Sequence, residues 1–260
     1  MSNKVIVFGN QKGGTGKSTL AMHLVVNLLH KGYKVGTIDV DAKQGTFTHY
    51  IENREKTKRE NPEILTPVHS AIIENESDSI TERDKENLTR FGEIMYQYRN
   101  FDFIVIDTPG SETSLSKIAH SFADKIITPM NESFVDLDLL VRIKDVKSNV
   151  LRPSIYAQMV WDQKKEKAMR QKGSIDWIVL VNRMSNAASK NRQDLEKVLN
   201  ALAPRMGFRF IKGFKERVVF RELFLYGLTL LDKKANVTNM NMSHIAAQQE
   251  LNDMLAALNI

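Results

Sequence analysis

The 260-residue sequence contains no cysteine, which excludes disulfide bonds and thiolate-ligated metal or iron–sulfur centres within it. It also has no apolar run near ~18 residues, the length that a membrane-spanning helix requires. Since an apolar segment begins at Val5, we expect no signal peptide. These absences favour a cytoplasmic protein that neither crosses nor anchors to a membrane.

Positive charge is unevenly distributed along the chain. Residues 142–221 carry 19 basic and 7 acidic side chains, whereas residues 1–141 carry 16 basic and 20 acidic ones. A solvated basic face would explain this concentration, but a surface that binds a polyanion explains it better. Hydrophobic residues make up 42% of the chain, and no linker divides it, so we predict a single domain over residues 1–260.

A glycine-rich segment joins a short apolar run to an amphipathic stretch. The run Val5–Phe8 is typical of a buried parallel strand, and apolar residues recur at helical spacing from Leu20 onward. A strand, a glycine loop and a helix are the context of a phosphate-binding loop. The predicted nucleotide-binding residues are Lys12, Gly13, Gly14, Thr15, Gly16, Lys17, Ser18 and Thr19.

The residue types of this loop suit a nucleoside triphosphate and Mg²⁺. Glycines let successive backbone N–H groups turn toward a polyphosphate, and the helix N-terminus adds partial positive charge. Lys17 would place a point charge on the β- and γ-phosphates, and the Ser18 hydroxyl would ligate Mg²⁺.

Carboxylates follow two further apolar runs. Asp39 and Asp41 follow Val35–Ile38, and Asp107 follows Phe103–Ile106 and precedes a Pro-Gly break. Side chains at the carboxyl ends of parallel strands face the ligand crevice of an open α/β sheet. Asp107 is therefore predicted to hold the Mg²⁺ shell. Asp41 is predicted to act at the site, whereas for Asp39 a function and a structural capping role remain equally open.

The loop departs from the plain phosphate-loop motif, because Gln11 stands where that motif has glycine and a second lysine, Lys12, precedes the glycine pair. The form Lys-Gly-Gly-x-Gly-Lys-Ser resembles the deviant Walker A loop of the ParA/MinD ATPase family. The resemblance implies an ATP-dependent homodimer in which Lys12 reaches the phosphates of the other subunit. It also implies that Asp41 orients the attacking water or the magnesium shell.

The same resemblance extends to two other segments. Residues 107–110, Asp-Thr-Pro-Gly, resemble the switch II segment of the family. Asn182, at the end of the apolar run 177–181, stands where related proteins place an adenine-reading asparagine, although an asparagine that satisfies a turn fits the spacing nearly as well.

Within the family, segments 128–136, 176–179 and 226–232 resemble the branch that positions the division plane. That branch implies an ATPase whose dimers bind nucleoid DNA non-specifically. Monomers would be recruited by ParB, and the resulting polar gradient would restrain FtsZ assembly. The alternatives are a ParA-type partition ATPase and a nucleotide-gated DNA-binding scaffold with negligible turnover.

We predict an α/β P-loop fold, a mostly parallel twisted sheet of five strands with helices on both faces and a sixth strand near residues 208–211. Helices are expected over Val135–Val150, Ser189–Ala203 and Lys215–Phe224, and a core-packing helix after Ser243. Residues 52–100 are expected to form surface helices and loops, and 162–172 a basic exposed segment. The predicted DNA-binding residues lie on the basic helices: Lys190, Arg192, Lys215, Arg217 and Arg221.

Overall fold

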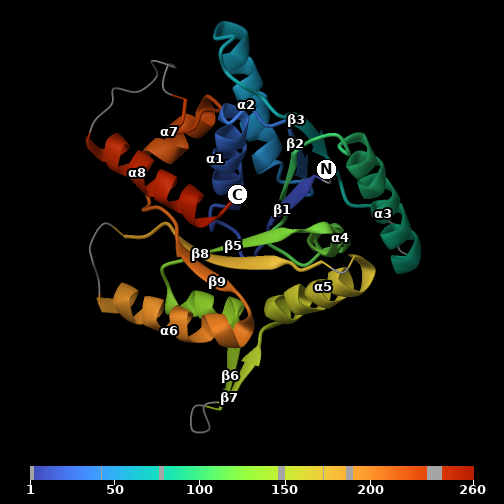
Figure 1. Cartoon of the computed structure of the whole chain (residues 1–260), viewed down its shortest axis with the longest axis vertical. Helices are drawn as coiled ribbons and strands as arrows, with labels where there is room; N and C mark the ends of the chain where they lie inside the picture. Colours follow the sequence, from blue (N-terminus) through green and yellow to red (C-terminus); the bar gives the residue numbers. More distant parts are fainter. Residues whose placement is uncertain are drawn as a thin grey trace.

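The computed structural model describes residues 3–41, 43–75, 79–145, 150–171, 173–185, 190–232 and 242–260. A single sheet of seven parallel strands runs through the middle of the molecule (Figure 1). Its strands are β1 (Lys4–Phe8), β2 (Val35–Asp39), β3 (Val68–Ala71), β4 (Phe103–Asp107), β5 (Lys125–Asn131), β8 (Asp176–Asn182) and β9 (Arg209–Lys212). Their spatial order is β3-β2-β4-β1-β5-β8-β9, and the predicted P-loop α/β fold is confirmed.

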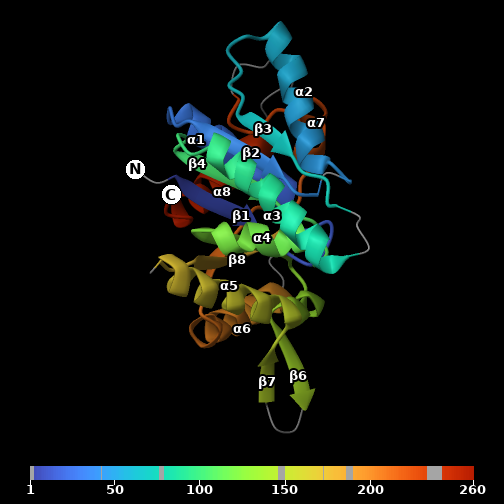
Figure 2. The same cartoon turned by 90° about the vertical axis from the view of Figure 1, so that its right-hand side faces the viewer.

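Helices cover both faces of the sheet (Figures 1 and 2). One apolar core contains side chains from α1 (Lys17–His30), α2 (Thr46–Glu60), α7 (Val219–Leu225) and α8 (Met242–Ala257). The other contains side chains from α3 (Ile80–Gln97), α4 (Ser114–Phe122), α5 (Ile155–Gln171) and α6 (Lys190–Met206). Because both faces are covered, consecutive residues of the central strands are buried rather than alternate ones, as in β4, where every residue is buried.

The strand register brings the predicted site segments together. Phe8, at the end of β1, pairs with Asp107, and Asp39, at the end of β2, pairs with the same residue. Parallel strands end at one edge, so the loop after β1 and both carboxylates meet there. The strand order alone therefore brings the loop and both carboxylates to the same edge of the sheet.

The sheet contains a strand, β3, that sequence reasoning missed in residues 52–100. Two of its residues, His69 and Ser70, are polar and form hydrogen bonds, with the hydroxyls of Thr37 and Tyr98 respectively. An edge strand of four residues with polar contacts lacks the apolar run by which strands are recognised. The helices expected within residues 52–100 are confirmed, because α3 and most of α2 lie there.

The helix predicted over Val135–Val150 is wrong. A short 3-10 helix, η1 (Phe134–Leu139), is followed by the antiparallel hairpin of β6 (Val141–Asp145) and β7 (Val150–Pro153). The segment has apolar residues at roughly helical spacing, but several are β-branched, which favours extended backbone. Leu140 and Val141 are buried at the root of the hairpin.

Two further expectations need adjustment, and three others are confirmed. The segment 162–172 is not simply exposed: most of it lies in α5, where Lys167 is buried against Asp124. The helix predicted from Lys215 begins at Val219, since Lys215 forms an isolated bridge with Met184. The sixth strand, the helix after Ser189 and the core-packing last helix are confirmed, the last by its buried Leu251. No helix among the described residues is long and apolar enough to cross a membrane.

Candidate functional site

The loop between β1 and α1 forms a curved backbone cradle. Gly14 and Gly16 have φ angles of 72° and 88°, a region that glycine occupies without strain. A Cβ on Gly16 would lie 2.4 Å from Nδ2 of Asn182, so this position also requires glycine for close packing. α1 begins at Lys17, which places the positive end of the helix dipole at the cradle.

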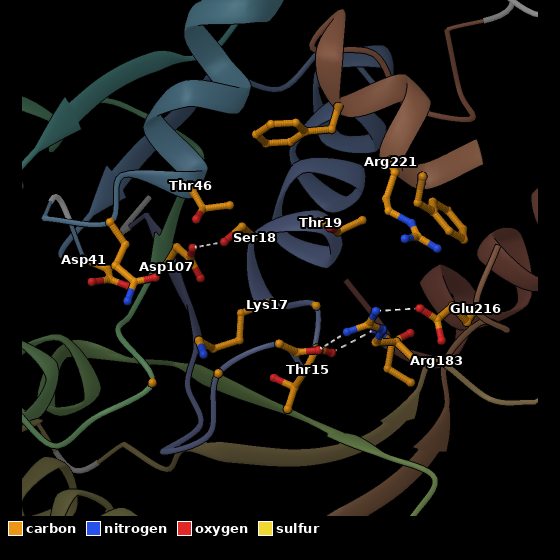
Figure 3. A pocket seen from close by; sticks show the side chains of 18 of the residues that line it. Thr15, Lys17, Ser18, Thr19, Asp41, Thr46, Asp107, Arg183, Glu216 and Arg221 are labelled. Carbon is orange, nitrogen blue, oxygen red and sulfur yellow. Dashed lines mark hydrogen bonds and ion pairs between the residues drawn. The ribbon is translucent and has the colours of Figure 1, made fainter. Parts of the chain in front are cut away.

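Lys17 lies inside the site with its charge near two carboxylates. Its Nζ donates a hydrogen bond to the Lys12 carbonyl at 3.1 Å. Burial lowers the pKa of Lys17, and the negative charges of Asp107 and Asp41 partly oppose that shift. Figure 3 shows Lys17, Asp41 and Asp107 around one cavity, where a bound triphosphate would give the ammonium its counter-charge.

Asp107 and Ser18 form the predicted metal-binding pair. The Ser18 hydroxyl donates to Oδ2 of Asp107 at 2.5 Å, while Oδ1 is buried and has no hydrogen-bond partner among the described residues. Burial, together with the negative charge of Asp39, raises the pKa of Asp107 to about 7. A buried carboxylate oxygen without a partner, beside a hydroxyl, fits a divalent cation.

The described residues contain no group of three or more His, Asp or Glu side chains that could hold a metal ion by themselves. Mg²⁺ binds through one or two protein oxygens together with waters and substrate phosphates. The Ser18–Asp107 pair therefore suits Mg²⁺ that arrives with a nucleotide.

The two aspartates after β2 have different environments. Asp39 is fully buried and accepts hydrogen bonds from the Asp41 N–H and from the Thr48 N–H and hydroxyl. These contacts support the capping role for Asp39. Asp41 is half-buried and lines the cavity, and burial followed by the charge of Asp39 raises its pKa.

Lys12 points away from the cradle that it precedes. Its Nζ donates to Oδ1 of Asp136 at 2.9 Å and to the Val135 carbonyl at 3.0 Å, both in η1. Its side chain remains 34% exposed. The two loop lysines thus lie in different surroundings, with Lys17 inside the site and Lys12 at its outer rim.

Asn182 and Arg183 close the other side of the loop. The Asn182 amide donates to the Thr15 carbonyl at 3.0 Å, and within the part of the chain that the structure describes its buried Oδ1 has no hydrogen-bond partner. Arg183 has a φ of 52° and donates to the Gly14 carbonyl and to Glu216. Sequence reasoning missed Arg183, although its place next to Asn182 at the strand end was a usable signal.

A cavity of about 770 Å³ extends from the phosphate loop to α7. Thr15, Lys17, Ser18, Asp41, Asp107 and Asn182 all line it, as do Phe214, Phe220 and Phe224. Three predicted DNA-binding residues also line this cavity: Lys215, Arg217 and Arg221.

The remaining DNA-binding predictions lie away from the cavity. Lys190 is exposed at the start of α6, whereas Arg192 pairs with Glu132 and its side chain is only 17% exposed. Arg217, which does line the cavity, also forms an ion pair, with Glu250 at 2.8 Å, and its side chain is only 11% exposed. The structure therefore does not gather the five predicted residues into one free surface.

The sequence matches a family model over nearly its whole length and curated proteins over a little more than half of it. The family model described as ATPase MipZ matches residues 4–260. MinD, the septum site-determining protein of Helicobacter pylori, is 29% identical over 163 residues, which cover 56% of this chain and 60% of that protein. The cytosolic Fe-S cluster assembly factor nubp2 of Xenopus tropicalis is 26% identical over 157 residues, 55% of this chain and 58% of that protein. The chain spans about three-fifths of the length of the curated relatives that it matches.

Solved structures with the same fold cover nearly the whole chain. A putative plasmid partition protein of Borrelia burgdorferi bound to AMPPNP has a TM-score of 0.58 at 21% identity, covering 99% of this chain and 100% of that chain. Apo McdA of Cyanothece has a TM-score of 0.63 at 19% identity, covering 99% of both chains. At these identities the likeness establishes the fold. Together with the whole-length family match, it shows that the chain belongs to the MipZ family of ATPases, within the ParA/MinD type that its loop predicted.

Proposed function

We propose that residues 1–260 act as a single P-loop domain that binds ATP with Mg²⁺ and hydrolyses it. Gly13, Gly14, Thr15, Gly16 and Thr19 present backbone groups to the phosphates, and Lys17 supplies their counter-charge. Ser18 and Asp107 would hold Mg²⁺, which would supply positive charge to offset that of the triphosphate. Asp41 orients the attacking water, and Asn182 reads the adenine through its free Oδ1.

The observation that carries this proposal is the separation of the two loop lysines. Lys17 faces the cavity, whereas Lys12 lies at the rim with its ammonium on Asp136. The position of Lys12 at the rim supports a contact with a second subunit, and the protein then dimerises when it binds ATP. Lys12 then acts in catalysis across the dimer interface.

In the cell, the ATP dimer binds DNA non-specifically and positions the division plane by inhibiting FtsZ assembly near the poles. A ParB-like protein recruits the monomer, which makes the protein cytoplasmic, nucleoid-associated and graded from the poles. Membership of the MipZ family and the basic composition of residues 142–221 support this assignment.

Two assays test the proposal. ATP turnover, measured with and without DNA and Mg²⁺, separates an ATPase from a nucleotide-gated scaffold, which would bind ATP without appreciable turnover. FtsZ sedimentation with ATP then separates a division inhibitor from a partition ATPase. Shorter or fewer FtsZ filaments support the proposal, and unchanged filaments favour the ParA-type alternative.

Asp41→Ala tests the catalytic assignment. Because Asp41 lines the cavity rather than forming part of the phosphate loop, the variant should bind ATP, dimerise and stall before hydrolysis. We expect turnover to fall about 100-fold or more, as for the loss of a positioned acid–base group. Normal turnover would remove Asp41 from the mechanism. Asp39→Ala is not an equivalent control, since that residue holds the turn itself.

A further inference from the structure

The β6–β7 hairpin extends away from the layered body of the molecule in both views (Figures 1 and 2). A two-stranded ribbon on its own is only marginally stable in water, so its direction depends on its root. That root is firmly held: the Ser154 N–H donates to the Leu140 carbonyl at 3.0 Å, and the Ser154 hydroxyl donates to the Leu139 carbonyl at 2.5 Å. The hairpin therefore projects from a root that hydrogen bonds hold in place.

The hairpin places two like charges directly opposite each other. Arg142 on β6 pairs in register with Arg152 on β7, and both are exposed. Among the residues that the structure describes, neither guanidinium has a carboxylate partner. Like charges at opposed positions destabilise a strand pair, so this arrangement does not stabilise the hairpin. Two guanidinium groups side by side are instead suited to bind an anion.

The charge of the whole segment points to a polyanion. Residues 141–153 contain four basic side chains and one acidic side chain. By contrast, Arg192 and Arg217 are held by Glu132 and Glu250, which leaves less free charge on the helices predicted to bind DNA. DNA carries about one phosphate charge per 1.7 Å of axis, and its major groove admits a two-stranded β-ribbon.

We propose that the β6–β7 hairpin is a DNA-binding arm in which Arg142 and Arg152 contact phosphates of the duplex. The proposal rests on the DNA binding proposed above and assigns it to a surface outside the basic helices. Each arm spans roughly 13 Å along β6, from the usual rise per residue of a strand. A dimer carries two such arms and four of these arginines.

The arm also has a defined connection to the nucleotide site. β6 follows η1 directly, and η1 supplies the Val135 carbonyl and Asp136 carboxylate that hold Lys12. If Lys12 leaves η1 when the dimer forms, the root of the arm loses one of its contacts. DNA binding by the arm is therefore expected to depend on the nucleotide state.

The test uses the full chain with AMPPNP and a fluorescent duplex of mixed sequence, titrated from about 0.05 to 0.2 M salt. The double variant Arg142→Ala/Arg152→Ala removes four arginines per dimer. It should flatten the slope of log affinity against log salt by roughly 3 to 4 and weaken binding about tenfold or more. Unchanged ATP affinity and far-UV circular dichroism would show that the rest of the domain is folded.

Two matched variants complete the design. Lys56→Ala/Arg59→Ala removes the same charge from exposed positions on α2 and should leave the slope unchanged. Arg142→Lys/Arg152→Lys keeps the charge and should keep most of the affinity. Both results support contact through charge at the hairpin.

Three results would overturn the proposal, and each has a different meaning. If the wild-type dimer binds the duplex and the double alanine variant has the wild-type slope, the arm is overturned while DNA binding stands. If the wild type binds no duplex, both proposals fall. If the variant keeps DNA binding but loses its effect on FtsZ, the arm belongs to a protein interface, which also overturns the proposal.

Discussion

At the scale of single residues, Lys17 is the main point charge that a triphosphate would meet in the loop. Lys17→Ala should raise the dissociation constant for ATP about 100-fold or more, since a charge-assisted contact in a buried site is lost. Isothermal titration calorimetry measures this directly. Lys31→Ala, an exposed lysine just beyond α1, is the matched control and should bind ATP normally. Unchanged affinity in Lys17→Ala would contradict the assignment of the loop.

The buried side chain of His23 should lower the free energy of unfolding at acidic pH. It is fully buried in α1, its Nδ1–H donates to the Thr19 carbonyl and its Nε2 accepts from the Leu230 N–H, so the neutral ring is required. Burial lowers its pKa to about 4. The unfolded chain takes up the proton near pH ~6.5, so stability is intact above that pH and falls as the pH drops toward 4.

Urea unfolding at several pH values checks this effect. Between pH ~6.5 and ~4 the wild type should lose roughly 2 to 3 kcal/mol more unfolding free energy than His23→Gln, which has no ionisable ring. Equal pH dependence in the two proteins would mean that His23 is protonated in the folded state.

At the scale of elements, the contact between α2 and the turn after α7 depends on Gly227. Its φ is +62°, and a Cβ there would lie 1.9 Å from the backbone nitrogen of Arg54. Gly227→Ala should therefore lower the free energy of unfolding by about 3 kcal/mol or more. Gly92→Ala, in α3 with no atom near the added methyl, should instead stabilise by ~0.5 to 1 kcal/mol. Thermal melting compares the pair, and two similar shifts would contradict the close packing at Gly227.

The elements also show how far sequence reasoning reaches. The long apolar strands and the glycine loop were predictable because burial on both faces and phosphate binding each leave a local pattern. β3 and the β6–β7 hairpin were not, since short strands at an edge or away from the sheet carry no such pattern. The buried pair of Arg54 and Asp232 joins distant segments, and sequence separation hides such contacts.

The same limit applies to the site. Lys17, Ser18, Asp41 and Asp107 line one cavity, because strand ends and loop spacing fix where they lie, while their roles stay predictions. For Arg183 the sequence offered only its position beside Asn182 at a strand end, because its contacts depend on a left-handed backbone and on Glu216, which lies far away in sequence. The capping role of Asp39 likewise depends on Thr48, a contact that spacing alone left open.

At the scale of the whole molecule, dimerisation should depend on Lys12 and Gly14. Lys12→Ala removes an ammonium that, among the described residues, is held by η1, so monomers should still bind ATP while dimerisation and turnover fall about tenfold or more. Gly14→Val adds bulk at a φ of +72° on the face of the loop and should block the dimer. Sedimentation velocity with AMPPNP measures both. Lys34→Ala serves as the exposed control, and normal dimers of either loop variant would contradict the interface.

The position of β1 also has a consequence for synthesis. β1 is made well before its two neighbours in the sheet, β4 and β5, which begin at Phe103 and Lys125. At ~5 to 20 residues per second, a ribosome needs roughly 5 to 20 s to make the intervening hundred or so residues. Throughout that interval the apolar run Val5–Phe8 has no strand to pair with, so the nascent chain is a natural client for a chaperone. The nucleotide site can assemble only once translation has passed Asp107, and ATP cannot assist the earlier steps of folding.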